Sequence, residues 1–242
     1  MFQFTFKMLV TGDTIIPAEG MQHIPEQLAA ALPKESIRCN AQVNELLVGD
    51  RKVRGVVMQN GERIMAEQVV VATDSLSATK MTGIALPAQP VGSVCLYFAG
   101  EEQLYPQRKI LLNSDAGAFV NNAVLITNIA PTYAPPRKHL LSVTVLDSPG
   151  EEDERLAQRC LNEIGKWFPE RELRHWKFLK AYRIPFSQFA QPPGVYDQLP
   201  DNRTGVEGLY LAGEYTKSSS IQGAMHSGEY AAKAVLKAAI HA

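Results

Sequence analysis

The chain has 242 residues, of which 45% are hydrophobic, so it can bury a substantial core in one large or two modest domains. The formal net charge is −1 and the basic residues are scattered, which argues against nucleic-acid binding. The three cysteines (Cys39, Cys95 and Cys160) are far apart without CxxC spacing and the five histidines lack metal-ligand spacing, which argues against a disulfide framework and a zinc site. A reducing, cytoplasmic location is expected.

The first third of the chain predicts one helix followed by short strands. Residues 1–7 alternate apolar and polar side chains like a strand and lack the pattern of a signal peptide. No apolar run reaches the roughly 18 residues that a membrane span needs. Helical spacing of apolar residues predicts a helix over 19–32. Strands are predicted at 36–39, 43–47, 53–59, 63–66 and 68–73, the last one fully buried.

The middle of the chain predicts a mixed sheet with one amphipathic helix. Strands are predicted at 92–98, 109–112, 123–128, 139–146 and 175–182. A helix is predicted over 151–168, with Leu156, Cys160, Ile164 and either Trp167 or Phe168 on its buried side. Four prolines between 185 and 200 then predict an irregular return segment.

The last forty residues carry the most informative pattern. A strand-like run over 208–214 ends at Gly213 and Glu214, and three serines at 218–220 precede a helix predicted from Ile221 to Ala239. A serine can cap such a helix, and the free backbone N–H groups at its start attract anions or electron-rich ring atoms. The pattern is typical of a parallel strand that leads into a ligand-facing helix N-terminus.

These residues resemble the closing motif of the flavin-dependent amine oxidase and phytoene desaturase superfamily. In that motif a strand ending Ala-Gly-Asp/Glu precedes a helix that reads (Glu/Gln)-Gly-Ala-x-x-Ser-Gly-x-x-Ala-Ala. Here the strand ends Ala212-Gly213-Glu214, and the helix reads Gln222-Gly223-Ala224-Met225-His226-Ser227-Gly228-Glu229-Tyr230-Ala231-Ala232. An ordinary strand and helix that need small residues for close packing would explain the same glycines and alanines.

The resemblance implies an α/β (mixed α+β) fold with an incomplete FAD-binding, Rossmann-like sheet and an inserted mixed-sheet substrate domain. Residues 17–83 and 201–242 would form the two parts of the FAD-binding domain. Residues 84–200 would form the substrate-binding domain, and 1–16 would add a strand to it. No two glycines lie two residues apart, so the GxGxxG turn that grips the FAD pyrophosphate is absent from this chain.

The resemblance therefore covers only the C-terminal part of a family member. Without the first two strands of the usual sheet, two hydrophobic strand edges would face water. We expect a separate chain that carries the GxGxxG half, or self-association, to cover them; a truncated product with an incompletely paired sheet is the other interpretation. FAD binding by this chain alone is expected to be weak or absent.

The resemblance also implies a set of cofactor-binding residues. Val43 would meet the adenine, Ala72 and Thr73 would pass the ADP half, and Glu214 would accept hydrogen bonds from the ribityl or pyrophosphate region. The backbone of Ile221, Gln222 and Gly223 would face the flavin N1 and O2. The full set is Val43, Ala72, Thr73, Gly213, Glu214, Ser220, Ile221, Gln222, Gly223 and Ala224. No cysteine follows Cys160, so non-covalent FAD is expected.

Two departures from the amine oxidases indicate the substrate class. Leu96 stands where those oxidases carry a lysine near the flavin N5, and Ser220 stands where they carry an aromatic residue against the amine. Both favour a lipophilic, isoprenoid-like substrate that would transfer hydride to the flavin. The candidate residues on the substrate side are Leu96, Tyr182, Phe186 and Phe189. An ordinary core would also explain the three aromatic residues.

Several questions stay open on the sequence alone. No catalytic side chain can be named. A non-catalytic binding or interaction module derived from this fold, and an amine oxidase with relocated machinery, remain alternatives. Peripheral membrane contact is compatible with a lipophilic substrate.

Overall fold

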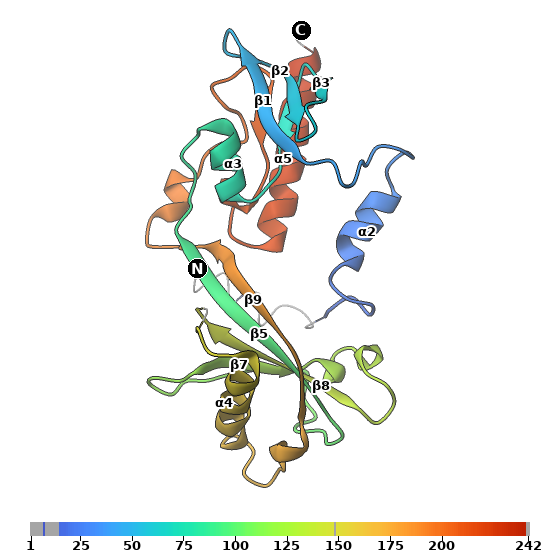
Figure 1. Cartoon of the computed structure of the whole chain (residues 1–242), viewed down its shortest axis with the longest axis vertical. Helices are drawn as coiled ribbons and strands as arrows, with labels where there is room; N and C mark the ends of the chain where they lie inside the picture. Colours follow the sequence, from blue (N-terminus) through green and yellow to red (C-terminus); the bar gives the residue numbers. More distant parts are fainter. Residues whose placement is uncertain (1–6, 8–14, 148, 241–242) are drawn as a thin grey trace. The chain divides into compact units, whose positions relative to one another are not determined.

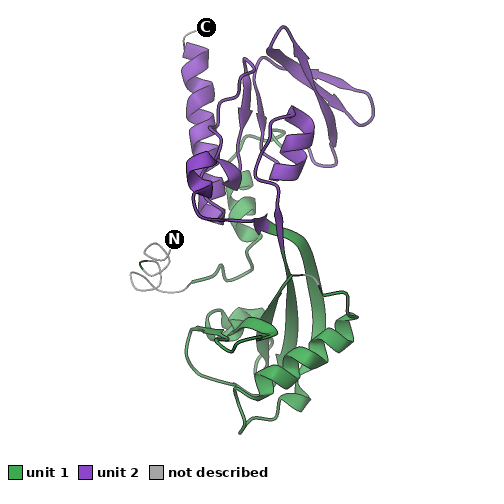
Figure 2. Ribbon diagram, turned by 90° about the vertical axis from the view of Figure 1, so that its left-hand side faces the viewer, with its two compact units in different colours: residues 1–37, 92–187 green, residues 38–91, 188–242 purple. Residues whose placement is uncertain are grey.

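The computed structural model describes residues 7, 15–147 and 149–240, which form two compact units. Unit 1 contains residues 1–37 and 92–187, and unit 2 contains residues 38–91 and 188–242 (Figure 2). The strand predicted at the N-terminus lies almost entirely outside the described residues. The predicted assignment of 17–83 to a cofactor domain is not tested by these bounds, although residues 17–37 group with unit 1.

Unit 1 is built on a mainly antiparallel five-stranded sheet in the order β6-β7-β8-β5-β9 (Figure 1). Its strands are β5 (Pro90–Gly100), β6 (Ile110–Leu112), β7 (Val120–Leu125), β8 (His139–Leu146) and β9 (Lys177–Phe189). The helices of this unit are α2 (His23–Ala30) and α4 (Asp153–Gly165), with short 3-10 turns η1 (Ile126–Asn128), η2 (Pro131–Tyr133) and η3 (Leu173–His175).

Alternation along β5 divides its side chains between the two faces of this sheet. Val94, Leu96 and Phe98 are fully buried and belong to the hydrophobic cluster that α4 completes. The predicted stripe Leu156, Cys160 and Ile164 is confirmed as the buried side of α4. Burial of each large apolar side chain stabilises the unit by about 1.5–3 kcal/mol.

Glu163 of α4 ties the helix to the edge of the sheet. Its carboxylate accepts hydrogen bonds from the backbone N–H groups of Phe119 and Val120, each with a closest approach of 3.1 Å, and from Asn113 Nδ2 at 2.7 Å. At the other end of α4, the Arg183 guanidinium binds Asp153 at 2.7 Å. The helix is therefore held against one face of the sheet by polar contacts at both ends of its packed stripe.

Unit 2 contains two smaller sheets. A three-stranded antiparallel meander consists of β1 (Val43–Gly49), β2 (Lys52–Met58) and β3 (Arg63–Met65), and a two-stranded parallel sheet pairs β4 (Val69–Val71) with β10 (Leu209–Leu211). The helices are α3 (Ser75–Thr82) and α5 (Ile221–Ile240), with the 3-10 turns η4 (Val195–Gln198) and η5 (Glu214–Thr216). None of the helices in the described ranges is long and apolar enough to span a bilayer.

The structure corrects several sequence predictions. Residues 36–39 form no strand: Arg38 instead pairs with Glu62 of the β2–β3 turn at 2.7 Å. Residues 126–128 form η1 and not the end of a strand. The strand predicted as fully buried at 68–73 is the shorter β4, and Val70 is 41% exposed because β10 is its only neighbour in the described part of the chain.

Two elements extend beyond what the sequence indicated. β9 continues past the predicted end at 182 to Phe189, alongside β5. The helix α3 was missed, although Asp74 is a recognisable N-cap whose carboxylate accepts a hydrogen bond from Ser77 N at 2.9 Å. The remaining helices and strands lie within a few residues of their predicted bounds, and the mixed α/β class is confirmed.

Candidate functional site

The parallel pair β4–β10 brings four of the predicted cofactor residues together. Ala72 and Thr73 follow β4, and Gly213 and Glu214 follow β10. The ladder continues one residue past the strands, since Ala212 N donates to Val71 O at 2.9 Å. The carboxyl ends of parallel strands share one edge, which is where open α/β sheets bind ligands.

A buried hydroxyl holds the turn after β10 in place. Ser227 of α5 has no exposed surface, and its Oγ accepts a hydrogen bond from Gly213 N at 2.8 Å. Thr216 of η5 lies 2.6 Å from the same oxygen. The strand end, the η5 turn and the middle of α5 are thus connected through one side chain.

Asn202 completes this network, and sequence analysis missed it. The residue is 4% exposed, and its Nδ2 donates to Leu211 O at 2.8 Å and to Ser227 Oγ at 3.0 Å. Buried polar groups of this kind hold one geometry when every partner is present. Nothing in the spacing of Asn202 marks it, because it precedes the strand in an irregular segment.

The start of α5 is capped as predicted. Ser220 Oγ accepts a hydrogen bond from Gly223 N at 2.9 Å. A Cβ on Gly223 would lie 1.9 Å from Ser218 O, so only glycine fits this close approach. No acceptor is recorded for the N–H groups of Ile221 and Gln222 within the described ranges, and these donors therefore remain available to a ligand.

The Glu214 carboxylate adds an acceptor beside these donors. Its Oε2 accepts a hydrogen bond from Ser219 Oγ at 2.6 Å, which fixes the side chain while its other oxygen is free of described partners. The edge thus offers one anionic acceptor at Glu214 and two backbone donors at the start of α5. This donor and acceptor set fits a group that carries both hydroxyls and an electron-rich ring carbonyl.

Val43 and Ala224 occupy the margins of this region. Val43 begins β1 and is half-buried, and α3, which follows Thr73, packs against β1. Ala224 is exposed on the first turn of α5. All ten predicted cofactor residues therefore belong to unit 2, and most of them are exposed on an open edge.

The predicted substrate residues are less uniform. Leu96 has no exposed surface and packs in the core beneath α4, and Phe189 is likewise fully buried. Tyr182 is 49% exposed and Phe186 is half-buried on β9. Of the four residues, only Tyr182 and Phe186 therefore present surface that a substrate could contact.

The second face of the unit 1 sheet carries residues that sequence analysis passed over. Tyr97 of β5 meets Tyr182 edge-on, with 5.8 Å between ring centroids, and Cys95 Sγ lies 3.2 Å from Ser142 Oγ. Burial, together with Cys95, raises the pKa of Tyr97 to about 12, so its phenol stays neutral. Strand alternation alone could have found Tyr97, since it follows the buried Leu96.

A model of the family described as "Flavin containing amine oxidoreductase" matches residues 1–236. The chain belongs to this family. Membership implies a flavin cofactor, and it confirms the superfamily that the closing motif indicated. The free donors at α5 and the acceptor at Glu214 fit the hydroxyls and ring carbonyl of such a group.

Two curated relatives of this flavoprotein family are carotenoid desaturases. The chain is 26% identical over 225 residues to a 15-cis-phytoene desaturase of an Oncidium hybrid, an alignment that covers 78% of this chain and 36% of the relative. It is 25% identical over 216 residues to a zeta-carotene desaturase of Synechocystis, covering 73% of this chain and 43% of the relative. The chain thus spans well under half the length of these relatives.

Solved flavoenzyme structures share the fold. A putative protoporphyrinogen oxidase from Exiguobacterium matches 94% of this chain and 52% of its own at a TM-score of 0.72 and 17% identity. A putrescine oxidase bound to putrescine matches 92% of this chain and 53% of its own at a TM-score of 0.63 and 14% identity. These likenesses confirm the predicted fold class.

Proposed function

We propose that this chain is the C-terminal, substrate-binding part of an FAD-dependent oxidoreductase that removes hydride from a lipophilic, uncharged substrate. The observation that carries the substrate class is the second face of the unit 1 sheet. The register places Cys95 opposite Thr144 and Tyr97 opposite Ser142, so neutral groups line these rows. The further members of the rows are Asn122 and Val124 on β7 and Tyr182 on β9.

The charge on this face argues against an amine substrate. None of the residues in these rows is acidic, whereas a buried protonated amine is ordinarily paired with a carboxylate. Lys180 adds a positive charge here, because its ammonium lies 5.0 Å from the Tyr182 ring centroid, and it would repel a cation. An apolar chain or ring could lie on Tyr97 and Tyr182 without leaving a charge unpaired.

FAD would supply the two-electron acceptor for this reaction. The Glu214 carboxylate would accept hydrogen bonds from ligand hydroxyls, and the N–H groups of Ile221 and Gln222 would stabilise negative charge on the ring carbonyl side. Ser227 and Asn202 act through the backbone, because they fix the position of Gly213 and hence of Glu214.

A segment that carries the GxGxxG turn would complete unit 2, and we propose that it docks on β4 and α5. β4 has an unpaired edge within the described part of the chain, with Val70 exposed at its centre. Edges of this kind pair readily with a further strand. The length of the relatives beyond this chain provides for such a segment.

α5 supports this docking surface because it has a buried side of small residues and an exposed apolar side. Gly223, Ser227 and Ala231 are buried at four-residue spacing against the rest of unit 2. The other side repeats at helical spacing and is exposed. It consists of Ile221 (58% exposed), Met225 (50%), Gly228, Ala232 and Leu236 (63%). A helix that is packed on one side and apolar on the other is suited to burial between two partners.

The substrate class can be tested on the chain joined to its GxGxxG segment. Under anaerobic conditions, a polyene hydrocarbon should bleach the oxidised flavin absorbance, and simple primary amines and polyamines should not. Tyr97→Ser with Tyr182→Ser should slow bleaching by the polyene at least about tenfold, because two aromatic contacts are lost. A control substitution at a tyrosine of η2 outside these rows, Tyr133→Ser, should leave the rate unchanged.

Rapid bleaching by an amine would contradict the proposed substrate class and favour an amine oxidase. Flavin that no donor reduces would favour a non-catalytic binding module. Light scattering on the chain, before and after the GxGxxG segment is added, separates the two proposed partners. A stable homodimer that persists and excludes the added segment would favour self-association on the α5 surface.

A further inference from the structure

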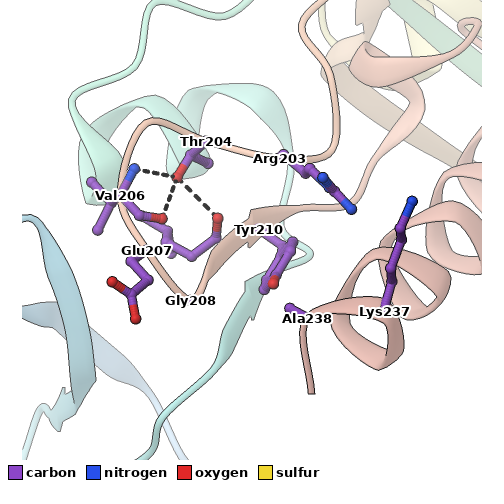
Figure 3. Close-up of a pocket in the computed structure, with 9 residues that line it drawn as sticks. Arg203, Thr204, Val206, Glu207, Gly208, Tyr210, Lys237 and Ala238 are labelled. Carbon is purple, nitrogen blue, oxygen red and sulfur yellow. Dashed lines mark hydrogen bonds between the residues drawn. The ribbon is translucent and has the colours of Figure 1, made fainter. Parts of the chain in front are cut away.

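A pocket of unit 2 lies at the amino end of β10 and the carboxyl end of α5, and Figure 3 shows its lining residues. Its volume is about 280 Å³, and its walls come from residues 203–204 and 206–210 and from Lys237 and Ala238 of α5. The predicted cofactor residues follow the carboxyl end of β10, whereas this pocket lies at its amino end. Along α5, Ile221 and Lys237 are separated by about 24 Å, so the two sites are distinct.

The lining of the pocket includes one phenol. Tyr210 is 6% exposed, and its oxygen forms no hydrogen bond with another described residue. This oxygen is not among the fully buried unpartnered atoms of the described ranges, so its O–H is accessible to a ligand. Tyr210 forms an isolated antiparallel bridge with Arg203, so both side chains leave the backbone on the same side.

Two cations line this pocket without an ion-pair partner in the described ranges. The charged ends of Arg203 and Lys237 point toward one another in Figure 3, and neither forms an ion pair in the part of the chain that the structure describes. The acidic residue of the pocket, Glu207, is occupied, since its carboxylate lies 2.7 Å from Lys52 Nζ. The hydrogen bond from Lys52 and the charge of its ammonium hold the pKa of the Glu207 carboxyl below its ordinary value.

The backbone around the pocket is fixed before any ligand binds. Val206 N donates to Thr204 Oγ1 at 3.0 Å, and this hydroxyl donates to Leu209 O at 2.9 Å. The loop between Arg203 and β10 is thereby closed on itself. A preformed loop lowers the entropic cost of binding.

We propose that Arg203, Tyr210 and Lys237 form a binding site for a phosphate group. A guanidinium, an ammonium and a phenol that line one cavity supply the positive charge and the hydrogen-bond donors for phosphate oxygens. A phosphate would also relieve the repulsion between the two cations. The ligand is a small phosphorylated compound or the headgroup of an anionic lipid, and the site is separate from the proposed flavin edge.

Calorimetric titration of the intact chain with pyrophosphate at low salt tests this proposal. Arg203→Gln with Lys237→Gln should weaken binding at least about tenfold, because charge-assisted hydrogen bonds are the strong ones. Tyr210→Phe should weaken it by a few-fold, since it removes one oxygen and preserves the ring. Circular dichroism confirms that each variant retains the fold.

The control keeps the change in net charge and alters only its position. Arg63→Gln with Lys80→Gln removes two exposed cations of unit 2 that do not line this pocket, and it should leave pyrophosphate affinity unchanged. Equal weakening by the control, or undetectable binding by the unaltered chain, would overturn the proposal. Binding that survives the Arg203 and Lys237 changes would overturn it as well.

A vesicle assay distinguishes the two sources of phosphate. Preferential flotation with phosphatidic acid vesicles over phosphatidylcholine vesicles, lost in the Arg203 and Lys237 variant, assigns the site to a lipid headgroup. Pyrophosphate binding without vesicle binding assigns it to a soluble compound. Both results support the site, and they differ only in the ligand.

Discussion

Unit 1 and unit 2 differ in how completely they bury their own apolar side chains. Unit 1 contains a continuous hydrophobic cluster that runs from Val94 to Trp176 in sequence, closed on one side by α4. Unit 2 divides its strands between two small sheets, and only three residues of its 20-residue helix α5 are buried. The comparison indicates that unit 1 can be stable by itself, whereas unit 2 has exposed apolar surfaces that a further polypeptide segment could cover.

The difference follows the proposed roles of the two units. A sheet that presents a substrate needs a rigid support, which the cluster beneath β5 provides. The edge that presents Glu214 and the start of α5 is held locally by Ser227 and Asn202, although the sheet around it has only two strands. Polar contacts thus preserve the site geometry where apolar burial is sparse.

The sharpest test of this comparison truncates one apolar side chain in each unit. Ile164→Ala should lower the free energy of unfolding by about 2–5 kcal/mol, because it opens a cavity in the core of unit 1. Met225→Ala on the exposed side of α5 should change it by about 0.5 kcal/mol or less. Urea unfolding measures both, and a larger loss at Met225 would show that α5 is already covered on that side.

The next effect concerns the hydroxyl that fixes the turn before Glu214. Ser227→Ala should cost about 1–3 kcal/mol, since it leaves Gly213 N without its acceptor and removes one of the acceptors of Asn202 Nδ2. Ser36→Ala, at an exposed position, is the matched control and should be neutral. A neutral Ser227→Ala would mean that the network does not hold this edge.

A smaller and pH-dependent effect is expected at the N-cap of α3. Hydrogen bonds from Ser77 lower the pKa of Asp74, so its charge stabilises the folded state above the unfolded pKa of about 3.9, and this contribution is lost as the pH falls through the folded value. Asp74→Ala should therefore cost about 1 kcal/mol at neutral pH and little in strong acid. A cost that persists unchanged below pH 2, on the order of two units under the unfolded value, would contradict this assignment.

The smallest expected effect is a difference in reactivity between two thiols, and it involves no change in stability. Burial raises the pKa of Cys160 to about 12, and the residue has no exposed surface, whereas Cys39 is exposed. In the folded protein, Cys39 should react with a disulfide reagent within the assay time and Cys160 only after unfolding. Rapid labelling of Cys160 would indicate that unit 1 opens readily and would weaken its contrast with unit 2.

Periodic patterns predicted most of the fold, and irregular segments account for the errors. The helix α4 and the strand β8 were predicted because their apolar spacing is regular, and the serine cap of α5 was read directly from the residues before it. Residues 36–39 were assigned to a strand from local composition, but local composition does not show whether a partner strand is present.

The sequence predicted residues of the candidate site only in segments that resemble the family. Glu214 and the start of α5 were found because a long pattern surrounds them. Asn202 was not, since it acts through a neighbour that is distant in sequence, Ser227. Tyr97 was also missed, although strand alternation marks it next to the buried Leu96. Leu96 was placed on the substrate side by motif position, and the structure buries its side chain in the core.

The FAD content of the purified protein tests the central claim most directly. The account predicts that the chain alone retains little or no FAD, and that it retains one equivalent when it is purified with a segment that carries the GxGxxG turn. Glu214→Ala should lower the FAD content of that complex, and Lys217→Ala, next to the same turn, should not. A chain that purifies yellow on its own, or a complex that remains colourless, would contradict the account.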